Sequence, residues 1–78
     1  MTIIQISAKI YWGFQVNISK DLLSSMKVDD IIIHVKNKMK IFFKTHNLLE
    51  LQEGVDNLNL HIHNFDIKDP VIYLCDHC

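Results

Sequence analysis

Hydrophobic and polar residues alternate along the first part of the chain. Apolar side chains occupy every second position of TIIQISAKIY, residues 2–11, and again of FQVNIS, residues 14–19. This spacing of two is typical of half-buried β-strands, in which successive side chains point to opposite faces. Trp12-Gly13 separates the two runs. Because glycine is favoured in turns, we predict a β-hairpin with its turn at Trp12-Gly13.

The apolar spacing changes to three and four after residue 27, which predicts an amphipathic helix over about 28–46. Lysine and asparagine take the opposite face. The apolar positions are Val28, Ile31, Ile32, Val35, Met39, Phe42 and Phe43. In the preceding connection, we expect Leu22 and Leu23 to form a short turn under the core. Ser24 or Ser25 is expected to cap the long helix.

Breakers follow the helix, and residues 47–57 are predicted to form a loop that contains Gly54. Alternation returns over 58–65, residues 66–70 turn, and VIYLC over 71–75 forms a last strand. The resulting order is hairpin, helix, hairpin. It predicts an α+β domain with a mixed four-stranded sheet, two parallel central strands, and one amphipathic helix packed across one face.

Part of the helix, Ile32–Met39 or IIHVKNKM, is similar to the apolar-x-x-Val-Lys-x-Lys-apolar run in the helix of ubiquitin-like proteins. With the element order, this resemblance implies a β-grasp-like ββαββ fold. Residues 1–78 would form a single ubiquitin-like domain, either alone or as the N-terminal domain of a longer protein. The sequence ends in Asp76-His77-Cys78 rather than two glycines. We therefore expect no role as a conjugated modifier.

Charge and composition limit the classes of partner. The net charge is −1, and all eight basic residues are lysine, so there is no arginine to hold phosphate or guanine in a bidentate geometry. Lys36, Lys40 and Lys44 share one helix face, which makes weak nucleic-acid binding a second alternative function. The many isoleucines, asparagines and lysines are typical of an AT-rich genome, such as that of a virus or a parasite.

The strongest chemical alternative is zinc. His61 and His63 project from one face of a predicted strand. Cys75 and Cys78, with His77 as an alternative ligand, lie in and just after the last strand. Thiolate and imidazole are preferred zinc ligands. A redox dithiol is less favoured because no helix N-terminus lies at the pair to lower a thiol pKa. If the chain continues, the two cysteines would instead open a following zinc module.

Catalysis has no recognisable motif in this sequence, so we predict a protein that is not an enzyme and needs no cofactor. The N-terminus lacks the pattern of a signal peptide, and no apolar run is long enough to span a bilayer. With two cysteines near one end, these features favour the reducing cytoplasm.

Interaction with another protein, or with a second copy of the chain, is the function that the sequence favours most. The sequence is 49% hydrophobic, which is a large share for a domain with a small interior. Some apolar residues also fall outside the buried pattern and are candidates for a partner surface: Ile3, Tyr11, Trp12, Ile33 and Ile41. An apolar patch or an exposed sheet edge would make the contact. The alternative is that the isoleucines merely reflect codon usage and a full core.

Overall fold

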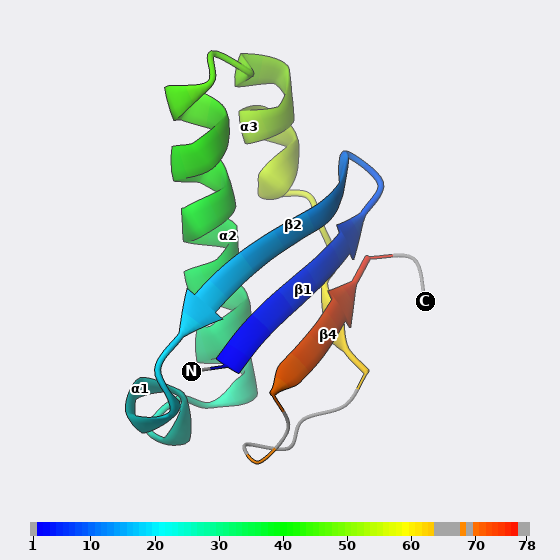
Figure 1. Ribbon diagram of the computed structural model, residues 1–78. Coiled ribbons are helices and arrows are strands. Elements are labelled where there is room, and N and C mark those ends of the chain that lie inside the picture. Colours follow the sequence, from blue (N-terminus) through cyan, green and yellow to red (C-terminus); the bar gives the residue numbers. More distant parts are fainter. Residues whose placement is uncertain (1, 64–67, 69, 77–78) are drawn as a thin grey trace.

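The computed structural model describes residues 2–63, 68 and 70–76. It confirms the predicted fold class: an α+β arrangement in which a long helix crosses one face of an open, mixed four-stranded sheet (Figure 1). The strands are β1 (Thr2–Ala8), β2 (Tyr11–Ile18), β3 (His61–Ile62) and β4 (Val71–Cys75). The helices are α1 (Lys20–Ser24), α2 (Val28–Thr45) and α3 (Leu49–Val55).

The sheet has the strand order β2-β1-β4-β3. β1 and β4 form the central pair and run parallel, with Ile4 beside Ile72 and Ile6 beside Leu74. β2 is antiparallel to β1, and β3 is antiparallel to β4. Two parallel strands therefore lie at the centre, as predicted, and β2 and β3 are the edges.

The turn of the first hairpin differs from the prediction. Lys9 and Ile10 connect β1 to β2, whereas Trp12-Gly13 lies inside β2. Asp76 explains part of this placement, because both of its carboxylate oxygens accept the Lys9 backbone N–H at 3.1 Å. The segment after β4 thus fixes the turn, and this long-range contact has no counterpart in the local sequence pattern.

Gly13 forms a β-bulge instead of a turn. Its φ angle is 78°, a conformation that glycine adopts without steric cost. The register shifts here, so that Ser7 pairs with Trp12 and skips Gly13. The bulge reverses the alternation of side chains. As a result, Tyr11 packs on the helix side of the sheet, while Trp12 lies on the opposite face and is 68% exposed.

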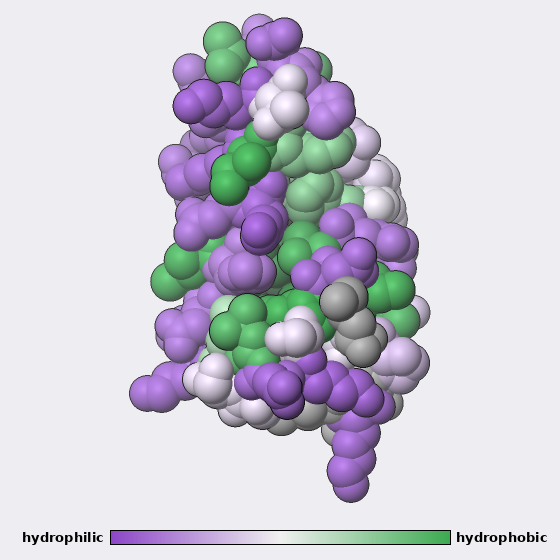
Figure 2. All heavy atoms as spheres, turned by 60° about the vertical axis from the view of Figure 1, so that its left-hand side comes forward, coloured by the Kyte–Doolittle hydropathy of each residue, from purple (hydrophilic) through white to green (hydrophobic). Residues whose placement is uncertain are grey.

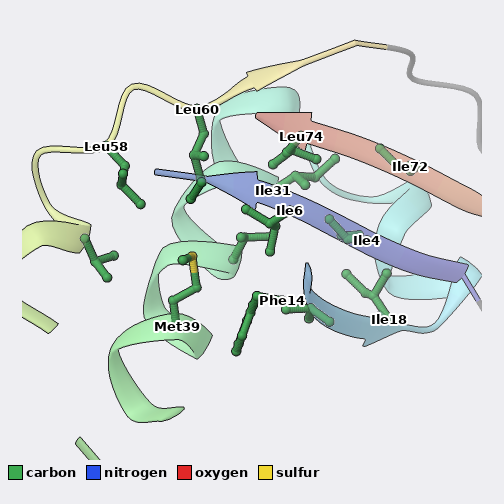
Figure 3. Close-up of a cluster of buried hydrophobic side chains, with 14 of the residues drawn as sticks. Ile4, Ile6, Phe14, Ile18, Ile31, Met39, Leu58, Leu60, Ile72 and Leu74 are labelled. Carbon is green, nitrogen blue, oxygen red and sulfur yellow. The ribbon is translucent and has the colours of Figure 1, made fainter. Parts of the chain in front are cut away.

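The core lies between α2 and the sheet, where apolar side chains from both layers interdigitate (Figure 3). From α2 it takes the predicted stripe of Ile31, Val35, Met39 and Phe43, all completely buried. The sheet contributes alternate residues of β1, β2 and β4: Ile4, Ile6, Ala8, Phe14, Val16, Ile18, Ile72 and Leu74. The apolar stripe of the helix and the alternate apolar residues of the strands, both predicted from the sequence, thus pack together in one core.

The connection before α2 forms the short helix α1. Its N-cap is Ser19, whose hydroxyl accepts the Leu22 N–H at 3.2 Å. Leu23 is buried as expected, whereas Leu22 is 47% exposed. The prediction that Ser24 or Ser25 caps α2 is wrong, because Lys27 holds that position and its backbone N–H bonds to Asp30.

The predicted loop over 47–57 contains helix α3. Asn47 ends α2 with a φ of 58°, and the Leu48 N–H reaches back to the Phe43 carbonyl at 2.8 Å. This is a Schellman ending, which satisfies carbonyls that a helix end would otherwise leave unpaired. The reversed chain then folds α3 against α2, where an ion pair joins Lys40 to Asp56.

Among the described residues of the predicted strand 58–65, His61 and Ile62 form β3 beside β4, and the His63 N–H donates to the Tyr73 carbonyl at 3.0 Å. Leu58 and Leu60 are buried as their alternation implied, but they precede β3. Residues 64–67, which hold the end of the predicted strand and the start of the predicted turn, lie outside the described residues. Pro70 directly precedes β4, and its carbonyl accepts the Ile3 N–H at 2.9 Å.

Candidate interaction site at the β2 edge

The backbone hydrogen bonds of β1 reveal which groups of β2 face outward. Ile3 donates its N–H toward β4, and the Ser7 carbonyl accepts from Asp76 on the same side at 3.3 Å. Because N–H and C=O directions alternate along a strand, Ile4 and Ile6 bond in the other direction, toward β2. Ile4 and Ile6 are therefore the hydrogen-bonded partners of β2.

Within β2, Val16 and Phe14 stand opposite those two residues and have their backbone groups occupied by β1. The same alternation directs the N–H and C=O groups of Gln15 and Asn17 away from the sheet. No other strand pairs with this side of β2 within residues 2–63, 68 and 70–76. β2 thus presents a row of backbone donors and acceptors along its outer edge.

An open groove of about 600 Å³ lies beside this edge, between β2 and α2. Figure 2 shows this side of the molecule, where apolar side chains gather in a band bordered by polar ones. Most of the groove belongs to Gly13–Asn17 of β2 and to the later turns of α2. Its residues are Tyr11, Gly13, Phe14, Gln15, Val16, Asn17, Lys38, Ile41, Phe42, Thr45 and His46.

Aromatic rings form a rigid side of the groove. Phe42 lies at the centre, with ring centroids 5.2 Å from Phe14 and 5.8 Å from Tyr11. On its other side the His46 ring lies 4.2 Å away, and the His46 Nδ1 bonds to the Phe42 carbonyl oxygen at 2.9 Å. Tilted and edge-on aromatic contacts of this kind hold rings in defined positions. The groove is therefore lined by packed aromatic rings and lies next to a backbone edge that pairs with no other strand among the described residues.

The two edges of the sheet differ in their capacity to bind another strand. β2 is eight residues long, and the sequence from Ile10 to Ser19 carries no charged residue. Proteins commonly protect long edges with lysine, proline or a bulge. β2 has only the bulge at Gly13, near its start. Within the described part of the chain, β3 covers only His61–Ile62 and offers a shorter edge.

The five residues predicted as candidates for a partner surface do not form one patch. Ile41 is 60% exposed and lines the groove. Tyr11 also reaches the groove, but it is half-buried and meets the Phe43 ring edge-on, with centroids 5.5 Å apart. Trp12 lies on the opposite face of the sheet, and Ile33, 57% exposed, is on α2 outside the groove. Ile3 is half-buried on the open sheet face.

The residues of the zinc hypothesis are only partly brought together. His63 Nε2 lies 3.0 Å from the Cys75 sulfur, and His61 stands opposite Cys75 in the β3–β4 ladder. Cys75 is disulfide-bonded, which differs from the expectation of reduced cysteines. Cys78 and His77 lie outside the described residues. Across the part of the chain that is described, no three His, Cys, Asp or Glu side chains are grouped to hold a metal.

The lysines of α2 have different surroundings. Lys40 is paired with Asp56 of the α3 end. Lys36 is half-buried and lines a second groove with Leu58 and Leu60, while Lys44 is exposed near the other end of the helix. No helix among the described residues is long and apolar enough to cross a membrane.

Sequence reasoning did not identify Gln15 and Asn17, the residues whose backbone groups face outward. The available signal was the charge-free run from residue 10 to 19, which is unusual for a strand next to solvent. Comparison with protein-family models, with curated proteins and with solved structures found no match to this chain. The candidate site therefore rests on its geometry.

Proposed function

We propose that this protein is a non-catalytic interaction module that binds an extended segment of a protein partner along the outer edge of β2. The observation that carries the proposal is the free backbone row at Gln15 and Asn17 beside an apolar groove. In strand addition, main-chain hydrogen bonds supply affinity, and pockets for alternate side chains supply specificity. The edge of β2 offers the main-chain groups, and the groove offers space for the side chains.

The bound segment would run beside β2 with its side chains alternating between two environments. Those on the helix side would enter the groove and contact Phe14, Val16 and Phe42. Those on the other side would lie beside the side-chain amides of Gln15 and Asn17, on the open face of the sheet. A segment with apolar residues at every second position therefore fits the edge best.

We further propose that the domain is a ubiquitin-like β-grasp. The long helix across one face and the central parallel pair support this relationship. In this interpretation, the domain acts by holding a sheet edge in position, and the resemblance adds no catalytic residue.

Selection of peptides tests the proposal without knowledge of the natural partner. A display library of random ten-residue linear peptides is selected on the wild-type protein and on Gln15→Pro. That proline removes one outward N–H and leaves the ladder to β1 intact, since proline is tolerated on edge strands. We expect wild-type binders with alternating apolar residues that lose affinity for the variant.

Two lysine variants serve as a matched pair. Gln15→Lys places a charge on the edge strand, whereas Gln5→Lys places the same charge directly opposite, on the fully paired strand β1. We expect weaker peptide binding only for Gln15→Lys. Peptides that bind all variants equally, or no enrichment on the monomeric protein, would contradict strand addition at β2.

A further inference from the structure

The side-chain pattern of β2 is symmetric about Val16. Phe14 and Ile18 lie two residues to either side, and both are apolar and buried against the helix layer. Gln15 and Asn17 flank Val16 directly, and both are exposed amides. A strand that reads apolar, amide, apolar, amide, apolar has the same pattern in the reverse direction. It is therefore complementary to an antiparallel copy of itself.

We infer that the partner of the β2 edge is a second copy of this chain, bound through antiparallel β2–β2 pairing with a two-fold axis at Val16. This inference rests on the proposed function, because it uses the same free edge. The pairing would join two four-stranded sheets into one continuous sheet, with both α2 helices on the same face. An interface of this type is isologous and closes on itself.

The backbone directions are compatible with this register. Gln15 and Asn17 point their N–H and C=O groups outward, so both must occupy hydrogen-bonded positions in the new ladder. Pairing Gln15 with Asn17 of the second copy satisfies this condition twice, once on each side of the axis. Val16 then faces Val16 of the second copy as a non-hydrogen-bonded pair, in which side chains come closest.

The side chains are compatible with this arrangement. On the helix side, Phe14 of one copy would lie opposite Ile18 of the other, so the apolar row continues across the axis. On the open face, the side-chain amide of Gln15 in one copy would lie opposite that of Asn17 in the other. Charge does not oppose the contact within β2, because residues 10–19 are uncharged. Lys38 of each groove is exposed, and its flexible stem allows the ammonium group to stay in water.

The first test is the mass of the 78-residue protein, measured by light scattering and sedimentation from micromolar to millimolar concentration. We expect a reversible dimer that Gln15→Pro abolishes. Two double variants then test the register. In Gln15→Lys/Asn17→Lys like charges face each other, which should weaken the dimer by roughly tenfold. In Gln15→Lys/Asn17→Glu opposite charges face each other, and the dimer should persist.

Cysteine crosslinking tests the position of the axis. Val16→Cys should form an intermolecular disulfide, because non-hydrogen-bonded pairs have Cα atoms about 4.5 Å apart, within the range of disulfides. Gln15→Cys is the control. The two copies of residue 15 would be roughly 8 Å apart, given the strand rise and spacing, which is too far to bridge. Peptide mapping separates these links from the native cysteines.

Three outcomes would overturn the inference. A protein that stays monomeric at millimolar concentration has no such dimer, even if selected peptides bind to β2, and the proposed function would then stand. A dimer that survives Gln15→Pro uses another surface. Crosslinking through Gln15→Cys but not Val16→Cys places the axis elsewhere. Failure of peptide selection on a monomeric protein would instead contradict the proposed function itself.

Discussion

The two glycines of this chain should respond in opposite directions to the same substitution. Gly13 has a φ of 78°, and a Cβ atom added there would meet nothing within 4 Å. The effect of Gly13→Ala is therefore purely conformational. Forcing an L-residue into the left-handed region costs about 1–2 kcal/mol. The reduced entropy of the unfolded chain returns about 0.4–1 kcal/mol. We expect a net destabilisation of about 1 kcal/mol.

Gly54 is the matched control. It lies inside α3 without a positive φ, and an added Cβ would sit 3.6 Å from the Ile10 Cγ2, an ordinary van der Waals contact. Alanine is favoured over glycine in a helix by roughly 0.5–1 kcal/mol. Gly54→Ala should therefore stabilise the protein. The two variants should differ by about 2 kcal/mol in unfolding free energy, or roughly 10 °C in melting temperature for a domain of this size.

Urea denaturation followed by far-ultraviolet circular dichroism measures this difference, provided that the m-value stays constant across the variants. Trp12, the only tryptophan, gives a second readout. Its emission should stay that of an exposed indole in Gly13→Ala if the bulge is kept. A Gly13→Ala protein as stable as Gly54→Ala would refute the argument, because it would mean that the bulge does not require the left-handed conformation.

Three further substitutions test other parts of the fold by the same denaturation assay. Thr2 is completely buried, and its hydroxyl has no hydrogen-bond partner among the described residues, so Thr2→Val should stabilise by roughly 1 kcal/mol; destabilisation would show that the hydroxyl is satisfied. Asn47→Gly should be close to neutral, whereas Asn47→Val should cost about 1–2 kcal/mol at this left-handed helix end; equal stability of the two would contradict the Schellman assignment. Asp76→Ala removes the acceptor of the Lys9 N–H and should cost about 1 kcal/mol; an unchanged midpoint would mean that the contact is not formed in solution.

The sequence predicted the elements whose hydrophobic period is long and uninterrupted. Helix α2 begins at Val28 as expected and ends one residue earlier than expected. Its buried stripe repeats at spacings of three and four over 18 residues. A repeat of this kind and length identifies a helix rather than a strand. The alternation of β1 and β4 was equally informative, since each strand packs one face on the helix.

The first hairpin was placed wrongly because one residue type serves two purposes. Glycine favours turns, but it also favours bulges, and the local sequence does not distinguish them at Gly13. One contact that holds the turn joins Lys9 to Asp76, 67 residues away. α3 was missed for a related reason. Its seven residues include Gly54, and the helix is held by packing on α2 rather than by its own propensity.

The candidate site could not be predicted from the sequence, although part of its signal was present. Apolar residues outside the buried pattern, such as Ile33 and Ile41, can be recognised from the sequence alone. A strand edge cannot, because it depends on which strands pair beside it. The outward direction of Gln15 and Asn17 follows only once β1 is known to lie between β2 and β4. That order depends on pairing between residues far apart in the chain, which a local pattern does not encode.

Amide hydrogen exchange, resolved by residue with NMR, tests the central claim most directly. In dilute solution the amides of Phe14 and Val16 should be protected by β1, while those of Gln15 and Asn17 exchange rapidly. When a selected peptide is added, or when the protein concentration is raised, Gln15 and Asn17 should become protected together. Binding that leaves both amides exchanging rapidly would show that the partner does not extend the sheet at β2, and the account would be wrong.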